Sequence, residues 1–509
     1  MKNLIKSSSI LGATEVALIL VSIVRAKYLA VNIGPEGYGE YSILVSYFAI
    51  LTAMCSGWLA RGTIKYIAEY KQKDDIVSVY KVHNYSISIA FILTAIATVL
   101  AFIFQDFVRT HFLSHKIILW HYLLFAASFF ATSITPFFAW LLQGFLLVKE
   151  TVKIRIITTL FGFLYILIFV YFYGITGYFV SILISSIFGL YLYWKATHNF
   201  LSTKLMLPNF KDEIFKKLMR FGGVNFILLI LHNITEYIQR VFILNALDIT
   251  SVGLFHVANS IMNYMGIANR ASTFVNDSKM SQDLSIEEYN KSLNDFIRFN
   301  ILTGLPISVI LILFSKDFIT LLYSKEFTSL APILIAFVFA QFLAFLAGGF
   351  HSVMLGKAFL KMHSIVSILN MIIILVIPYF FISQYGLLII GISMIAGNIM
   401  TLLLDYCYLN IKISFKLSHR VLAILTISIL CFYFSYLLQS DSSVVFINHN
   451  LKELVPTDWS KSTGEYLNYN IKYIEFSCKI IFIILMSTFL FITLTKTERM
   501  KLINLVKSK

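Results

Sequence analysis

Apolar residues occur in long continuous runs along the whole chain, separated by short polar segments. A run of roughly 20 apolar residues is the length of an α-helix that spans a bilayer. The runs do not alternate over segments of about ten residues, as the strands of a membrane barrel do. The pattern therefore predicts an all-α integral membrane protein. About fourteen spanning helices are expected, at residues 9–31, 40–60, 83–104, 118–143, 154–173, 176–194, 219–241, 251–272, 298–323, 329–354, 362–382, 387–407, 419–438 and 475–495.

The Lys and Arg residues between the apolar runs predict how the chain is oriented. Of the 41, 30 fall in every second connecting segment and 8 in the alternate ones. Positive side chains concentrate on the cytoplasmic side of a membrane. We therefore expect both termini in the cytoplasm. The N-terminal apolar run contains Glu15 and is followed by no cleavage signal, so we expect it to be the first permanent helix.

Composition supports a membrane protein and excludes several other classes. The 509 residues are 58% hydrophobic and 13% charged, with a mean hydropathy of +0.81. Soluble domains are about 45–50% apolar and about 25% charged. The net charge of +15 lies in short connecting segments, which indicates membrane orientation rather than nucleic-acid binding. The four cysteines show no metal-ligand or disulfide spacing, so we expect no metal site. The phosphate-binding motif of ATP-driven enzymes is absent, so direct use of ATP is not expected.

A short phrase at the end of one apolar run returns 212 residues later. Tyr173-Gly174 matches Tyr385-Gly386, and Gly144 matches Gly356 at the same offset. Two weaker matches have offsets of 211 and 214, and they pair residues 104–107 with 315–318 and residues 38–41 with 252–255. The six helices of residues 1–213 are therefore predicted to repeat in residues 214–410. Residues 411–509 would add two helices and an external loop at 440–474.

Six helices are an even number, so both copies would enter the membrane in the same orientation. Two parallel six-helix bundles form a V-shaped central cleft and rock around it, which gives alternating access. Each Tyr-Gly also has a local role, because glycine permits a tight turn between two helices and tyrosine anchors at the membrane interface. The repeat therefore predicts a transporter.

Loop and turn motifs carry a resemblance to a known family. They are GPEGYGEYS at 34–42, ARGTIKYIAEYK at 60–71 and SKDFITLLYSKEF at 315–327, together with the two Tyr-Gly turns. Over about residues 5–410 the chain resembles the polysaccharide-transporter branch of the multidrug/oligosaccharidyl-lipid/polysaccharide exporter superfamily.

The resemblance implies a Wzx-type flippase, which is not an enzyme. Such a protein moves polyprenyl-pyrophosphate-linked oligosaccharide from the cytoplasmic to the outer leaflet of a bacterial inner membrane, for O-antigen or capsule-type polysaccharide. It would contact membrane lipids and the polysaccharide polymerase machinery, and we expect a monomer.

Polar residues within the apolar runs are the candidate site residues. Asn225, His232, Glu236 and Arg240 recur at intervals of 7, 4 and 4, so they share one helix face. Such residues usually face the interior of a bundle or a water-filled cavity. The other candidates lie on three helices predicted to line the same cleft: Glu15 and Arg25 on the first, Arg61 at the end of the second, and Asn259, Asn263 and Arg270 on the eighth.

A lipid-linked pyrophosphate implies roles for these residues. Arg25 and Arg270 would bind the diphosphate, because the guanidinium fork matches phosphate oxygens. Arg61 and Arg240 lie nearer the mouths of the cleft, and Glu15 and Glu236 could pair with arginines or couple transport to H⁺ or Na⁺. The membrane potential alone could also drive transport, and no cofactor is expected.

Simpler roles stay open for the same residues. The asparagines could be interhelical hydrogen-bonding groups, and arginines near helix ends could extend to water. His232 and Glu236 do not form a metal-binding motif.

Two rival functions are weighed. A drug/cation antiporter of the same superfamily would need a cleft without Arg25, because a cationic cleft repels cationic drugs. A membrane polysaccharide polymerase or ligase would place catalytic groups in a large external loop. The loop at 440–474 contains His449 but no recognisable catalytic constellation.

Overall fold

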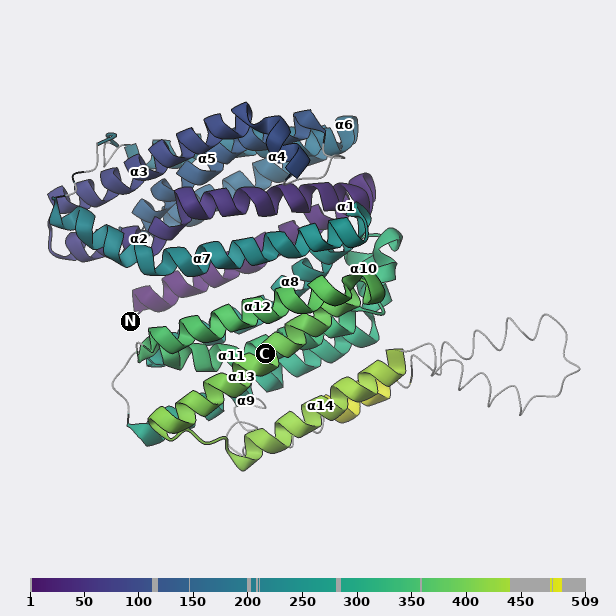
Figure 1. The fold of residues 1–509 in the computed structure, drawn as a ribbon. Helices are drawn as coiled ribbons and strands as arrows, with labels where there is room; N and C mark the ends of the chain where they lie inside the picture. Colours follow the sequence, from purple (N-terminus) through teal and green to yellow (C-terminus); the bar gives the residue numbers. More distant parts are fainter. Residues whose placement is uncertain are drawn as a thin grey trace, which may run out of the picture. The chain divides into compact units, whose positions relative to one another are not determined.

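The computed structural model describes residues 2–111, 118–145, 147–198, 203–206, 209, 211–280, 285–357, 359–439, 477 and 479–487. These residues form helices and no β-strand (Figure 1). The longer elements are α1 (Lys2–Cys55), α2 (Ala60–Gln72), α3 (Ile76–Ile103), α5 (Leu119–Gly144), α6 (Val148–His198), α7 (Glu213–Ala246), α8 (Ile249–Met280), α9 (Ile286–Leu313), α11 (Leu334–Gly356), α12 (Leu360–Tyr385), α13 (Leu388–Ile413) and α14 (His419–Gln439). The short ones are η1 (Gly57–Leu59), α4 (Gln105–His111), α10 (Ser315–Leu322) and η2 (Lys325–Leu330).

The predicted all-α membrane class is confirmed. Among the described residues, eight helices are long and apolar enough to cross a membrane, or nine if one bent pair counts as a single span. That number treats α6 as one helix. The count of fourteen stays a prediction, and the external loop at 440–474 and most of the last helix lie outside the described residues.

Helix α6 is two antiparallel helices joined by a single glycine. Its 51 residues would extend about 75 Å if straight, which is far more than the bilayer core of about 30 Å. Gly174 breaks it with φ 55° and ψ −131°. Beyond the break the chain returns on itself, because Ser181 Oγ donates to the carbonyl of Tyr165 at 3.0 Å. A Cβ on Gly177 would lie 1.8 Å from the carbonyl oxygen of Phe169.

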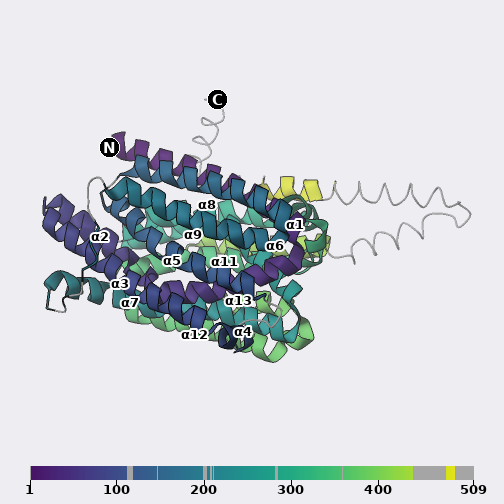
Figure 2. The same ribbon diagram turned by 90° about the horizontal axis from the view of Figure 1, so that it is seen from above.

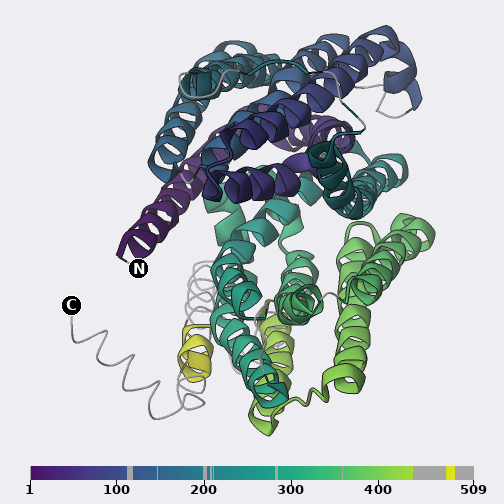
Figure 3. The same cartoon turned by 90° about the vertical axis from the view of Figure 1, so that its left-hand side faces the viewer.

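The second Tyr-Gly turn has the same backbone conformation. Gly386 joins α12 to α13 with φ 57° and ψ −145°, and these two helices pack side by side (Figure 3). The predicted tight glycine turns are therefore confirmed at both positions. Helices α3 and α9 also match, because each has 28 residues and is followed after one residue by a short helix. The parallel arrangement of two six-helix copies stays a prediction.

Two predicted boundaries were wrong. Residues 61–82 lie between two predicted spanning helices and were expected to connect them, but α2 covers Ala60–Gln72 and α3 begins at Ile76. The sequence of α2 is amphipathic, so it can place its charges on one face and pack the other. The helix predicted at 298–323 begins at Ile286 instead, ends at Leu313 and continues after Phe314 as α10.

Contacts divide the chain into two compact units. Unit 1 contains residues 1–256 and 321–326, and unit 2 contains residues 257–320 and 327–509. The first unit therefore extends beyond residue 213, where the sequence repeat placed its boundary, and includes α7. In unit 1, α5 and α6 lie side by side (Figures 1 and 2), and α1 packs against α6 and α7. In unit 2, α11 packs against α9, α12 and α13.

A capping residue outside the membrane fixes the start of α7. Asp212 accepts hydrogen bonds from the Ile214 amide at 2.9 Å, from Lys81 Nζ at 3.1 Å and from Tyr85 Oη at 3.1 Å. Partial burial raises the pKa of Asp212, but the three hydrogen bonds outweigh it, so the pKa lies below its ordinary value. Asp212 thereby ties the start of α7 to α3, and it helps to hold α7 within unit 1.

Candidate functional site

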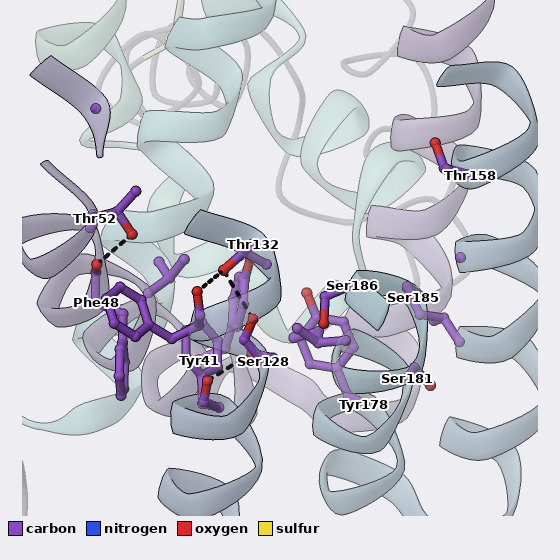
Figure 4. Close-up of a pocket in the computed structure, with 18 of the residues that line it drawn as sticks. Tyr41, Phe48, Thr52, Ser128, Thr132, Thr158, Tyr178, Ser181, Ser185 and Ser186 are labelled. Carbon is purple, nitrogen blue, oxygen red and sulfur yellow. Dashed lines mark hydrogen bonds between the residues drawn. The ribbon is translucent and has the colours of Figure 1, made fainter. Parts of the chain in front are cut away.

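A cavity of about 680 Å³ lies entirely within unit 1. It is enclosed by α1, α5 and α6, with η1 and two residues of α7 at its edge. Figure 4 shows its hydroxyl and aromatic side chains. The residues that carry its polar groups are Arg25, Tyr41, Thr52, Ser128, Thr132, Thr158, Thr159, Tyr178, Ser181, Ser185, Ser186 and Asn233. We call this space the unit 1 cavity.

Most cavity hydroxyls donate their proton to their own helix. Thr132 Oγ1 donates to the carbonyl of Ser128 at 3.1 Å, and Ser128 Oγ donates to Phe125 at 2.7 Å (Figure 4). Thr52 does the same to Phe48 at 2.9 Å, as does Ser181 to Gly177 at 2.7 Å. A hydroxyl whose proton is used in this way still offers oxygen lone pairs. These walls therefore present acceptors, which suit a ligand rich in O–H or N–H donors.

Arg25 is the predicted site residue that borders the unit 1 cavity. It lies on α1 before the break at Gly34, and its side chain is exposed. It is the one Lys, Arg, Asp or Glu among the residues that line the cavity. Its charge acts on the hydroxyl of Tyr178, which is buried. The Tyr178 ring meets the Tyr41 ring edge-on at a centroid distance of 5.0 Å. The cavity therefore combines one cation, five aromatic rings and many neutral acceptors.

Three residues of the predicted polar face of α7 do come together. His232 Nε2 lies 3.4 Å from Glu236 Oε1, and Glu236 Oε2 lies 3.3 Å from Arg240 Nη1. Arg240 is buried, with Nε donating to Ser42 Oγ at 2.8 Å and its guanidinium 5.6 Å from the centre of the Phe255 ring. His232 is exposed. The row thus runs from an exposed imidazole to a buried guanidinium that holds α7 against α1.

The other predicted site residues are not part of this arrangement. Asn259 is half-buried and Asn263 is exposed on the part of α8 that belongs to unit 2. The side chains of Glu15, Arg61, Asn225 and Arg270 lie outside the described residues. The structure therefore groups His232, Glu236 and Arg240, and it places Arg25 separately at the unit 1 cavity.

Sequence reasoning missed a buried polar triad in unit 1. Glu40 Oε1 lies 2.6 Å from His121 Nδ1, and His121 Nε2 lies 2.8 Å from Thr176 Oγ1. Glu40 and His121 are buried, and the three residues come from α1, α5 and α6. Glu40 belongs to the GPEGYGEYS motif, which was interpreted from sequence only as a loop and turn motif. Its partner stands 81 residues away, so no local pattern could pair them.

Known structures share this membrane-spanning helical fold. The lipid II flippase MurJ, in an inward closed conformation, is similar with a TM-score of 0.65 at 16% identity, covering 86% of this chain and 99% of that chain. An inward-facing multidrug resistance MATE family transporter of the MOP superfamily has a TM-score of 0.64 at 15% identity, covering 78% of this chain and 94% of that chain. An outward-facing structure of such a transporter has a TM-score of 0.56 at 18% identity, covering 80% of this chain and 96% of that chain.

The particular family follows from the sequence. The family described as "Polysaccharide biosynthesis protein" matches residues 4–275, which is more than half of the chain. The chain belongs to this family. No curated protein matches it closely in sequence. The chain is thus a member of a polysaccharide biosynthesis family whose fold is shared by a lipid II flippase and by multidrug transporters.

Proposed function

We propose that the chain is a flippase for lipid-linked oligosaccharides. It would move polyprenyl-pyrophosphate-linked repeat units from the cytoplasmic to the outer leaflet of a bacterial inner membrane by alternating access, and supply O-antigen or capsule-type polysaccharide synthesis. Membership of the polysaccharide biosynthesis family supports this substrate class. The shared fold with a lipid II flippase supports the mode of action.

The observation that carries the proposal is the chemistry of the unit 1 cavity. Its volume of about 680 Å³ falls within the range of about 300–1,000 Å³ that ligand sites occupy. A sugar presents many O–H donors, and the cavity hydroxyls keep acceptor lone pairs toward it. A pyrophosphate needs a cation with several donors, and Arg25 supplies one at the same cavity. The cavity thereby matches the two polar parts of the substrate.

The remaining candidate residues keep their proposed roles. Arg270 and Arg61 would bind or guide the diphosphate, and Asn225, Asn259 and Asn263 would contact sugar. Arg240 would hold α7 in place through Ser42 and Glu236. We expect a monomer that works with the polysaccharide polymerase machinery, with both termini in the cytoplasm.

A complementation experiment tests the proposal. The chain is expressed in cells that lack their own polysaccharide flippase and contain the matching repeat-unit pathway, and surface polysaccharide is quantified. We expect the wild type to restore polymer and Arg25→Ala to lose it at least tenfold, whereas Arg25→Lys keeps part of the activity because the charge remains. Lys27→Ala is the charge-matched control on the same helix, and it should retain wild-type activity.

A second pair of variants tests the Ser and Thr hydroxyl groups that line the unit 1 cavity, which we call the hydroxyl wall. Thr132→Val removes a cavity acceptor with little change of shape, and it should reduce polymer several-fold. Thr98→Val is the matched control, because Thr98 also donates to its own helix, at 2.7 Å to Thr94, and does not line the cavity. Equal activity in both variants would remove the sugar-binding role of the wall.

The antiporter is the alternative outcome. Wild-type chain that restores no polymer but lowers drug accumulation in the same cells would replace the flippase proposal with the drug/cation antiporter. Polymer restored equally by every Arg25 variant would leave the flippase in place and exclude the unit 1 cavity as its pyrophosphate site.

A further inference from the structure

Unit 2 contains a cluster of three titratable side chains on three packed helices, a buried carboxylate and two half-buried histidines. His351 lies near the end of α11, His363 in the first turn of α12 and Asp405 on α13. His351 Nε2 lies 3.4 Å from Asp405 Oδ2. The two imidazole rings are 4.9 Å apart between centroids and stand at 74° to each other. All three residues belong to one compact unit.

The cluster has unused hydrogen-bonding capacity around a buried carboxylate, while the His351 side chain is 35% exposed and His363 is half-buried. The Asp405 side chain is fully buried, with 0% of its surface exposed. Among the described residues, neither Asp405 oxygen has a hydrogen-bond partner, and the same is true of His351 Nε2 and His363 Nδ1. Buried polar atoms are nearly always paired in native proteins, and exceptions need an explanation.

The explanation must account for charge as well as geometry. An ionised carboxylate buried without hydrogen bonds is very costly, and such a group becomes neutral or acquires a paired cation. Both solutions need one proton, which resides either on Asp405 or on His351. Histidine is the side chain that exchanges protons near neutral pH. We propose that His351, His363 and Asp405 form a proton-binding site within unit 2.

The surroundings favour a proton over other ligands. Among the described residues, no group of three or more His, Cys, Asp or Glu side chains has the geometry of a metal site. The electrostatic interactions on His363 come from His351 and Asp405. Helix α9, which packs against α11, carries buried Arg298, and Lys357 at the end of α11 lies 4.4 Å from the centre of the Tyr289 ring of α9.

Polar residues farther along the same helices are already satisfied. Asn370 of α12 donates to Thr401 of α13 at 2.9 Å, and Asn398 of α13 donates to the carbonyl of Ala340 in α11 at 2.8 Å. Thr401 lies one helical turn before Asp405. Among the polar residues named here on α11, α12 and α13, the buried atoms without a hydrogen-bond partner therefore belong to Asp405 and its two histidines.

Proton binding here would change how three helices attract one another. A proton from water binds to the carboxylate or the imidazole, and no other bond forms or breaks. With the proton bound, α11 and α13 are joined by a neutral or oppositely charged pair; without it, a buried anion faces neutral imidazoles. A ligand that favours one packing shifts the population toward it. If the proposed flippase function holds, this site couples oligosaccharide export to protons.

Infrared difference spectroscopy on the purified full-length chain in lipid nanodiscs tests the site without any substrate. Spectra are compared between about pH 5 and about pH 8, the range in which histidine exchanges protons. We expect a carboxylic C=O band that changes with pH in the wild type and is lost in Asp405→Asn. Glu40→Gln, which alters the other buried carboxylate–histidine pair, should keep the band. A wild-type band unchanged in Asp405→Asn would overturn the proposal.

Two further measurements keep the result interpretable. His351→Gln retains the carboxyl but removes its cationic partner, so the Asp405 band should persist over the whole pH range. A band that still varies with pH as in the wild type would also overturn the proposal. Transport of a lipid-linked oligosaccharide in vesicles is then measured with and without a pH gradient. A pH-dependent Asp405 band in a protein that moves no such lipid would refute the flippase and leave the proton site standing.

Discussion

Among the described residues, each unit buries one carboxylate beside a histidine, and the two pairs differ in how completely they are hydrogen-bonded. In unit 1, Glu40 and His121 are 2.6 Å apart, and the second nitrogen of His121 meets Thr176 at 2.8 Å. In unit 2, His351 and Asp405 stand 3.4 Å apart, and Asp405 has no hydrogen bond among the described residues. Both carboxylates are buried, but the pairs differ in hydrogen bonding and in the exposure of the histidine side chain, which is 1% for His121 and 35% for His351.

The difference indicates two uses of the same chemistry. A pair whose hydrogen bonds are complete fixes three helices in one arrangement, and breaking it leaves an uncompensated buried charge. A pair with open positions can gain or lose a proton without breaking a hydrogen bond, and its charge is not fixed by hydrogen-bonding partners. We therefore infer that the unit 1 pair is structural and that the unit 2 pair is the one suited to respond to pH.

The largest expected effect is on Glu40. Glu40→Ala removes the carboxylate from His121 and should lower the free energy of unfolding by about 3–5 kcal/mol, the loss seen when a buried pair is broken. Reversible unfolding in lipid–detergent mixtures measures it. Glu36→Ala, in the same motif but exposed, is the control and should change stability little. A loss below about 1 kcal/mol would show that the pair is not structural.

The two glycine turns should respond equally, because here the units have the same conformation. An added Cβ meets no atom within 4 Å at Gly174 or Gly386, and both have positive φ. Gly174→Ala and Gly386→Ala should therefore each cost about 1–2 kcal/mol from backbone strain alone, measured by thermal unfolding in detergent. Unequal losses would mean that the turns are not equivalent. Gly177→Ala, which would clash with the Phe169 carbonyl, should cost more than either.

A carboxylate outside the membrane gives a reference with a defined pH dependence. The pKa of Asp212 is lowered by its hydrogen bonds in the folded state, so its stabilisation is fully present above about pH 4, its unfolded value, and is lost as pH falls through the lower folded value. Asp212→Ala should cost about 1 kcal/mol at pH 7. In acid, the difference in the free energy of unfolding between Asp212→Ala and wild type should disappear. Glu213→Ala, at the exposed neighbour, is the control and should change stability little at pH 7.

The smallest expected effect is on Asp405, although it is the more deeply buried carboxylate. Asp405→Asn removes a buried charge without breaking a hydrogen bond, so stability at pH 7 should stay within about 1 kcal/mol of wild type or rise. The same unfolding assay that is used for Glu40 measures it. A loss as large as that of Glu40→Ala would mean that Asp405 is held by contacts of structural importance, and it would remove the contrast between the units.

The fold was predictable where one local rule determines it. Continuous apolar runs predict spanning helices, and Tyr-Gly after such a run predicts a reversal, which Gly174 and Gly386 provide with positive φ. The prediction for the segment 61–82 was wrong because its charged residues were taken to indicate a connection between two helices. Its residues can also form an amphipathic helix, as α2 does.

The site was predictable only in part. Regular spacing on α7 grouped His232, Glu236 and Arg240, as the structure does. The hydroxyl wall gave no comparable signal, because single Ser and Thr residues in apolar helices are also common packing residues. The pairs Glu40–His121 and His351–Asp405 join residues far apart in the chain, so only the three-dimensional arrangement identifies them.

The glycine turns also have a consequence for how the protein enters the membrane. A reversal made within one or two residues leaves almost no loop between the two halves of α6, or between α12 and α13. Neither half can then be translocated and held alone while the next one is made, since no linker could span the gap between them. Each pair is therefore expected to leave the insertion machinery as a preformed hairpin. These two turns are also the places where an inserted tag or a reporter fusion would be least tolerated.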